Sequence, residues 1–163
     1  MIDPLRIDLV ELRRRLATRR SFQREATVQG LVVGSTFVPE DEPVRVDLDL
    51  ESVSNGVMVA GTVRASWEGE CRRCLEPVRG VVEVEVQELF SDNGDPDEIY
   101  PIEGDEIDLR PMVRDAIVLN LPLAPLCRPD CLGPDPERYP ALVEGENPVD
   151  RRWAGLSELR FKD

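Results

Sequence analysis

The sequence contains no histidine among its 163 residues, and aromatic residues make up only 5% of it. Without histidine the chain cannot perform Ser-His-Asp or Cys-His catalysis and has no imidazole ligand for a metal. No apolar run approaches the roughly 18 residues that a membrane span needs. The first residues also lack the basic-then-apolar pattern of a signal peptide. We therefore expect a cytoplasmic protein with no membrane partner.

Positive charge is scarce as well, because 33 acidic residues outnumber 20 basic ones and the net charge is −13. A uniformly basic nucleic-acid binder is excluded, since the global field repels phosphate. The charges are unevenly placed: residues 11–30 contain six arginines and two acids, whereas residues 81–108 contain eleven acids and no base. The chain therefore has a basic segment at 11–30, and within the acidic middle we expect residues 91–106 to form a loop.

Hydrophobic alternation predicts a mainly β, α+β fold. Three segments, near residues 44–50, 57–67 and 82–86, alternate apolar with polar residues. Asn55–Gly56, between the first two, suits a tight hairpin turn. We expect an antiparallel sheet or a partial barrel with one buried face. The residues predicted for the buried core are Val44, Val46, Leu48, Val59, Val63, Val82, Val84 and Met112.

Helices are predicted to be few. Residues 5–10 alternate like a strand, and residues 11–24 fit either a short helix or an exposed arm. The apolar spacing predicts one main helix near residues 108–120, with Asp108 as its N-cap and Pro122 ending it.

The C-terminal third is rich in proline. Residues 122–148 should be irregular, and Trp153, Leu156 and Leu159 suggest a short C-terminal helix that docks on the core. With no internal repeat, we expect residues 1–163 to form a single domain.

The four cysteines form two close pairs, Cys71 with Cys74 in a CxxC and Cys127 with Cys131 in a CxxxC. The first pair falls between two predicted strands, where a metal-binding knuckle would sit. Two such pairs suit one structural zinc ion held by four thiolates. This site would have a charge of −2, which nearby cations would offset. The arginines next to the cysteines are Arg72, Arg73 and Arg128.

Three other interpretations of the cysteines stay open. A redox dithiol usually opens a helix after a strand in a βαβ unit, and no such unit is predicted here. Disulfides are disfavoured in a reducing cytoplasm. The third alternative is that all four are plain reduced thiols.

Several motifs, taken in chain order, resemble one known family. Residues 51–63 lead into Gly-Glu-Cys-Arg-Arg-Cys-Leu-Glu-Pro-Val at 69–78, followed by Glu-Leu-Phe at 88–90, Cys-Arg-Pro-Asp-Cys at 127–131 and Asp-Arg-Arg-Trp-Ala-Gly-Leu at 150–156. This order resembles the YceD family, the large ribosomal RNA subunit accumulation proteins. The resemblance covers residues 5–160, and Cys-x-Arg-Cys-Leu-x-Pro is its most specific part. It implies a role in accumulation of the large-subunit ribosomal RNA.

The chain departs from this family at one point. Fuller members continue with two more cysteines, and Asp135 and Arg138 stand at those positions here. A metal site that used the missing pair would be lost, whereas a site made by the first two pairs would be intact.

We therefore expect a non-enzymatic factor in large-subunit biogenesis that binds ribosomal RNA or a large-subunit ribosomal protein. The acid pair Asp105–Glu106 lies in a predicted loop without catalytic partners, so neither catalysis nor a small-molecule substrate is expected. The alternative is an acidic, zinc-stabilised adaptor that holds a basic ribosomal protein on residues 83–108 without direct RNA contact. The residues predicted to bind RNA or a partner are Arg13, Arg14, Arg15, Arg19, Arg20, Arg24, Arg72 and Arg73.

Overall fold

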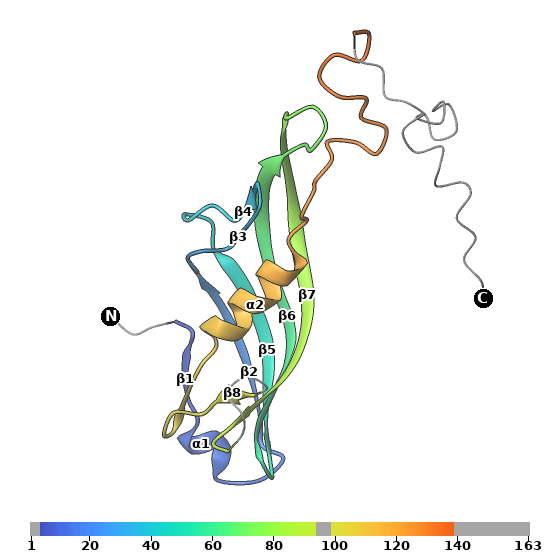
Figure 1. Ribbon diagram of the computed structural model, residues 1–163. Coiled ribbons are helices and arrows are strands. Elements are labelled where there is room, and N and C mark those ends of the chain that lie inside the picture. Colours follow the sequence, from blue (N-terminus) through green and yellow to red (C-terminus); the bar gives the residue numbers. More distant parts are fainter. Residues whose placement is uncertain (1–3, 94–98, 139–163) are drawn as a thin grey trace, which may run out of the picture.

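The computed structural model describes residues 4–93 and 99–138, in which strands dominate (Figure 1). The predicted mainly β fold is therefore confirmed. In chain order the elements are β1 (Arg6–Asp8), α1 (Val10–Arg13), β2 (Arg19–Ala26), β3 (Val32–Val33), β4 (Thr36–Phe37), β5 (Val44–Val53), β6 (Gly56–Glu70), β7 (Pro77–Ser91), β8 (Tyr100–Pro101), β9 (Glu106–Asp108) and α2 (Arg110–Asn120).

The centre of the molecule is a long, twisted, open sheet in which β2, β5, β6 and β7 are consecutive antiparallel neighbours. Strand β6 pairs with β7 along one of its edges and with β5 along the other. Beyond the end of β5, the same edge of β6 pairs with β4, where Phe37 lies opposite Glu68. Strand β8 is parallel to the end of β7. Of the two predicted arrangements, the open sheet is the one that forms among the described residues.

The predicted tight turn between the first two long strands is confirmed. Strands β5 and β6 are joined by Ser54 and Asn55, and the positive φ falls on Gly56, at +149°. A Cβ at Gly56 would overlap the backbone carbonyl oxygen of Phe90 on β7. Glycine is needed here both for its φ and for the close approach of β7.

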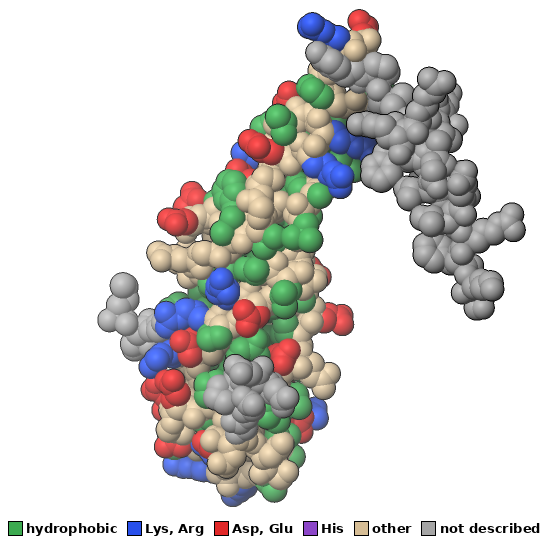
Figure 2. All heavy atoms as spheres, in the orientation of Figure 1, with side chains coloured by type: hydrophobic (Ala, Val, Ile, Leu, Met, Phe, Trp, Pro, Cys, Tyr) green, Lys and Arg blue, Asp and Glu red, His purple; other side chains and the backbone are tan. Residues whose placement is uncertain are grey.

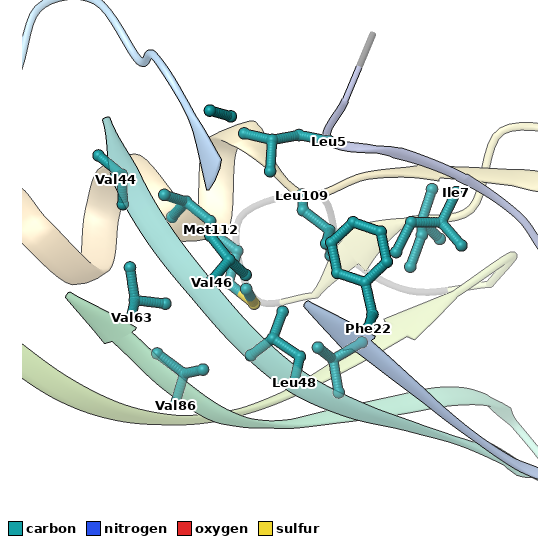
Figure 3. Close-up of a cluster of buried hydrophobic side chains, with 14 of the residues drawn as sticks. Leu5, Ile7, Phe22, Val44, Val46, Leu48, Val63, Val86, Leu109 and Met112 are labelled. Atoms are coloured by element: carbon teal, nitrogen blue, oxygen red, sulfur yellow. The ribbon is translucent and has the colours of Figure 1, made fainter. Parts of the chain in front are cut away.

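One face of the sheet is covered by α2 and by the small β1–β9 pair, and the core lies between them (Figures 1 and 3). The alternation of β5 places Val44, Val46, Leu48 and Leu50 on this face, where each is at most 1% exposed. Every residue predicted for the core is buried, except Val84, which is half-buried.

Helix α2 agrees with its prediction to within two residues, with one correction at its start. The N-cap position is Leu109, and the carboxylate of Asp108, one residue earlier, accepts a hydrogen bond from the backbone N–H of Arg110 at 2.9 Å. At the other end Leu121 is extended, as expected for a residue that precedes proline.

Two segments differ from their predictions. Residues 11–24 are neither one helix nor an arm, because α1 ends at Arg13 and β2 begins at Arg19, while the strand predicted over 5–10 is limited to β1. The acidic segment predicted as a loop contains β8.

The remaining predictions fall partly outside the described residues. Residues 122–138 are irregular, as predicted, whereas residues 139–148 and the helix expected around Trp153, Leu156 and Leu159 lie outside. Within residues 4–93 and 99–138, no helix is long and apolar enough to cross a membrane.

Candidate metal centre

The first cysteine pair lies in the connection between β6 and β7, at one end of the long sheet (Figure 1). The backbone N–H of Cys71 donates to the carbonyl oxygen of Glu76 at 2.8 Å, and the N–H of Leu75 donates to the carbonyl of Cys71 at 2.9 Å. These two bonds close a tight knuckle around Cys71 and Cys74. The predicted position of the CxxC between two strands is confirmed.

The second cysteine pair reaches the knuckle because the chain after α2 runs along the sheet toward the same end (Figure 1). The segment is fixed at Pro122, whose carbonyl oxygen accepts a hydrogen bond from the Thr36 hydroxyl at 2.8 Å. Further along, the carbonyl of Pro125 accepts the backbone N–H of Arg72 at 2.9 Å. Sequence reasoning missed Thr36, because nothing in its own neighbourhood indicates so distant a partner.

Arg73 ties the two segments together directly. Its Nη1 donates to the carbonyl oxygen of Cys131 at 2.7 Å and to that of Pro129 at 3.3 Å. In the structure this side chain braces the second cysteine pair against the hairpin, and its predicted contact with RNA or a partner stays a prediction.

The four cysteine sulfurs converge, as the sequence predicts. The Sγ atoms of Cys71 and Cys131 are 3.8 Å apart, those of Cys74 and Cys127 are 3.6 Å apart, and all four lie within 4.8 Å of one another. All four are thiols. Tetrahedral zinc, with Zn–S bonds of about 2.3 Å, places its sulfurs about 3.8 Å apart. The donor set and its spacing therefore fit one four-coordinate zinc ion.

The thiols differ in accessibility and in acidity. Cys71 and Cys131 are buried, whereas Cys74 is half-buried and Cys127 is exposed. Hydrogen bonds from the backbone of Cys74 and then of Cys127 lower the pKa of Cys71 to about 6. Desolvation, followed by the neighbouring thiols, raises the pKa of Cys127 to about 12. The knuckle thus favours the thiolate that a metal requires at Cys71.

The two positions that lack the family's further cysteines make no contribution to this cluster. In the part of the chain that the structure describes, the cluster of possible metal ligands contains only the four cysteines. The carboxylate of Asp135 instead accepts the backbone N–H of Arg138 at 3.2 Å.

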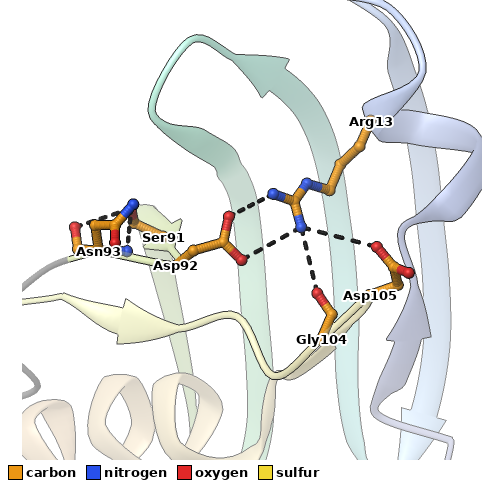
Figure 4. Close-up of polar contacts among 6 residues, drawn as sticks. All are labelled: Arg13, Ser91, Asp92, Asn93, Gly104 and Asp105. Atoms are coloured by element: carbon orange, nitrogen blue, oxygen red, sulfur yellow. Dashed lines mark hydrogen bonds and ion pairs between the residues drawn. The ribbon is translucent and has the colours of Figure 1, made fainter.

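The predicted RNA-binding arginines do not form one surface, because α1 lies at the end of the sheet opposite the cysteines (Figure 1). At the end of α1, Arg13 binds the carboxylates of Asp92 and Asp105 and the carbonyl oxygen of Gly104 (Figure 4). This side chain links the N-terminal segment to the acidic one. Sequence reasoning missed this link, since the two acids are about 80 to 90 residues away in the chain.

Other arginines of this set also have partners within the protein. Arg14 pairs with Glu11 at 2.9 Å, and Arg19 pairs across the strands with Glu51 at 3.0 Å. The side chain of Arg20 donates to the carbonyl oxygen of Asp8.

The remaining arginines of the set are exposed. Arg24 donates to the carbonyl of Gln23, and its guanidinium lies 5.3 Å from the centre of the Phe22 ring. Arg15 and Arg72 are the other two.

The sheet face turned away from α2 is a charged, solvated surface. Ion pairs cross between neighbouring strands there, including Arg45 with Glu25 at 2.6 Å and Arg64 with Glu83 at 3.4 Å. Glu85 is exposed on the same face. Such exposed pairs contribute little to stability, and they intersperse both signs of charge.

Comparison with known proteins adds the family. The family model described as "Large ribosomal RNA subunit accumulation protein YceD" matches residues 59–160, which include all four cysteines. An uncharacterised protein of Mycobacterium tuberculosis (strain ATCC 25618 / H37Rv) is 38% identical over 170 residues, covering 96% of this chain and 81% of the relative. Uncharacterised protein YlbN of Bacillus subtilis (strain 168) is 27% identical over 162 residues, covering 89% of this chain and 91% of the relative. No solved structure was found to match the chain.

Proposed function

The chain belongs to the YceD family, and from that membership we propose that it is a non-enzymatic factor for accumulation of the large-subunit ribosomal RNA. It acts in the cytoplasm, binds one structural zinc ion, and works by binding a protein of the large subunit. The family match over residues 59–160 is the observation that supports the role most strongly. The convergence of the four cysteines supports the metal.

Zinc would be held by the four thiolates of Cys71, Cys74, Cys127 and Cys131. Bound there it would supply a closed, tetrahedral cross-link, and four protein ligands leave no open position for a substrate. The chain's own groups prepare the site: the knuckle hydrogen bonds orient Cys71, and Arg73 holds the carbonyl of Cys131. A cross-link at this point would fix the irregular segment 122–138, which has few buried apolar side chains.

A protein partner is favoured over direct RNA contact by the charges. The net charge is −13, whereas affinity for RNA depends on neutralising phosphates. Three of the eight arginines predicted to bind RNA or a partner, Arg13, Arg14 and Arg19, already pair with acids. On the face shown in Figure 2, basic and acidic side chains are interspersed rather than gathered by sign. A chain with a net charge of −13 attracts a basic protein overall, which speeds their encounter.

Depletion of the protein in cells tests the proposed role. Mature large subunits should fall relative to small subunits on a sucrose gradient, and large-subunit ribosomal RNA should fall with them. Wild-type protein supplied from a plasmid should restore both. Unchanged subunit ratios after verified depletion would contradict the role.

Crosslinking in the same cells, with formaldehyde to capture proteins and ultraviolet light to capture RNA, separates the two kinds of partner. Recovery of a large-subunit protein and no RNA supports the adaptor. Recovery of ribosomal RNA crosslinked at Arg15, Arg24 or Arg72 would instead favour direct contact.

A further inference from the structure

Two exposed leucines directly follow the two cysteine pairs at the end of the β6–β7 hairpin. Leu75 comes after Cys74 and is 67% exposed, and Leu132 comes after Cys131 and is 54% exposed. Single exposed leucines are ordinary, but Leu75 has a φ of +62°. That left-handed conformation favours glycine and strains a residue with a Cβ. The chain therefore holds an apolar side chain in solvent at a position where the backbone is strained.

The surrounding hydrogen bonds hold the backbone at both leucines. The backbone N–H of Leu75 is bonded to the carbonyl of Cys71 at 2.9 Å, within the knuckle. Leu132 follows a cysteine whose carbonyl oxygen is held by the Arg73 guanidinium at 2.7 Å. The backbone that carries the two side chains is thus fixed relative to the same sulfur cluster. Fixing a contact residue before binding lowers the entropy that binding costs.

The charge around these leucines indicates what kind of surface they would meet. We define the tip as residues 70–77 and 126–138; it contains four arginines and five acids. A zinc ion with four thiolates would add a charge of −2. The tip is therefore slightly acidic and carries two exposed leucines, a combination that disfavours phosphate and suits an apolar pocket with a basic rim.

We infer that the tip is a protein-docking site that inserts Leu75 into an apolar pocket on a basic protein, with Leu132 of the same tip as a second apolar contact. The inference rests on the proposed function only for the source of that protein, the large ribosomal subunit. The cysteine cluster then has a second consequence beyond its cross-link, because it sets the position of both leucines.

Photocrosslinking tests the site on the full zinc-loaded chain. Benzoylphenylalanine is placed at position 75, or at position 119 as a control, since Leu119 is 82% exposed on α2 and outside the tip. Each protein is irradiated with proteins extracted from purified large subunits and, separately, with protein-free large-subunit ribosomal RNA. A crosslink from position 75, and not from 119, to one identified basic protein is expected. A crosslink to RNA, to residues 139–163 of the same chain or to a second copy overturns the inference, as does none.

The identified protein, once purified, allows the leucine itself to be tested. Leu75→Gly relieves the positive φ, so zinc content and thermal stability should be equal to or above those of the wild type. Affinity for the partner should nevertheless fall at least tenfold, whereas Leu119→Ala should leave it within twofold. Undiminished affinity of Leu75→Gly would overturn the inference. The proposed role in large-subunit accumulation would survive that result, because the depletion experiment measures it independently.

Discussion

Arg73 offers a test of how the two cysteine-bearing segments are joined. The substitution Arg73→Ala removes the two hydrogen bonds from Nη1 to the carbonyl oxygens of Cys131 and Pro129 and leaves all four sulfurs in place. A hydrogen bond from a charged group contributes about 1.5–3 kcal/mol. Arg73 is exposed, so solvent screening reduces the expected loss to about 1–2 kcal/mol. That loss corresponds to roughly a tenfold weaker hold on the second pair.

The assay is transfer of zinc from the loaded protein to an excess of a chelator that changes absorbance when it binds the metal. Arg73→Ala should release zinc about ten times faster than the wild type. Arg72→Ala is the matched control, because it removes the same charge one residue away, while the backbone N–H that bonds to Pro125 remains. Its release rate should stay within about twofold. Equal rates for the two variants would refute the bracing role of Arg73 and leave only a general effect of charge.

Two further predictions concern the core and the titration of the site. Val63→Asp places an unpaired charge on the buried face of β6, where Val63 is 0% exposed, and should lower the free energy of unfolding by on the order of 4 kcal/mol or more. Circular dichroism during a thermal melt should show this loss of stability. The control Ser66→Asp, at an exposed position of the same strand, should melt like the wild type. Equal melting temperatures for the two variants would refute the assignment of Val63 to the core. Zinc affinity should rise with pH, because the raised pKa of Cys127, about 12, means that zinc must displace its proton at neutral pH. The lowered pKa of Cys71, about 6, means that a proton competes with zinc for this sulfur only near and below that pH. A chelator competition that gives the same zinc affinity at about pH 6 and about pH 8 would contradict this prediction.

The long elements could be predicted from the sequence because their own residues carry the signal. Strands β5, β6 and β7 alternate, and α2 repeats its apolar residues at helical spacing. Strand β2 could not be predicted in this way, since only Phe22 and Ala26 of its eight residues are buried. Its extended conformation comes from pairing with β5, and that is a tertiary contact.

The candidate site was predictable to a different extent for each kind of residue. The cysteines were found because short-spaced pairs are a local pattern with a known geometry. The roles of Arg13 and Arg73 were not, because a run of arginines looks the same whether its guanidinium groups meet solvent, RNA or distant parts of the chain. Arg13 meets the acidic segment and Arg73 the second cysteine pair, both through contacts more than 50 residues apart.

Metal analysis of the purified full chain tests the central claim, a structural zinc ion on four cysteines. The protein is prepared under reducing conditions without added metal, and its zinc is measured by inductively coupled plasma mass spectrometry beside Cys74→Ser. We predict about one zinc ion per wild-type chain and a large loss in the variant, with residues 122–138 becoming more open to proteolysis. A wild-type protein that carries no metal and shows four thiols titrating with a thiol reagent would contradict the claim.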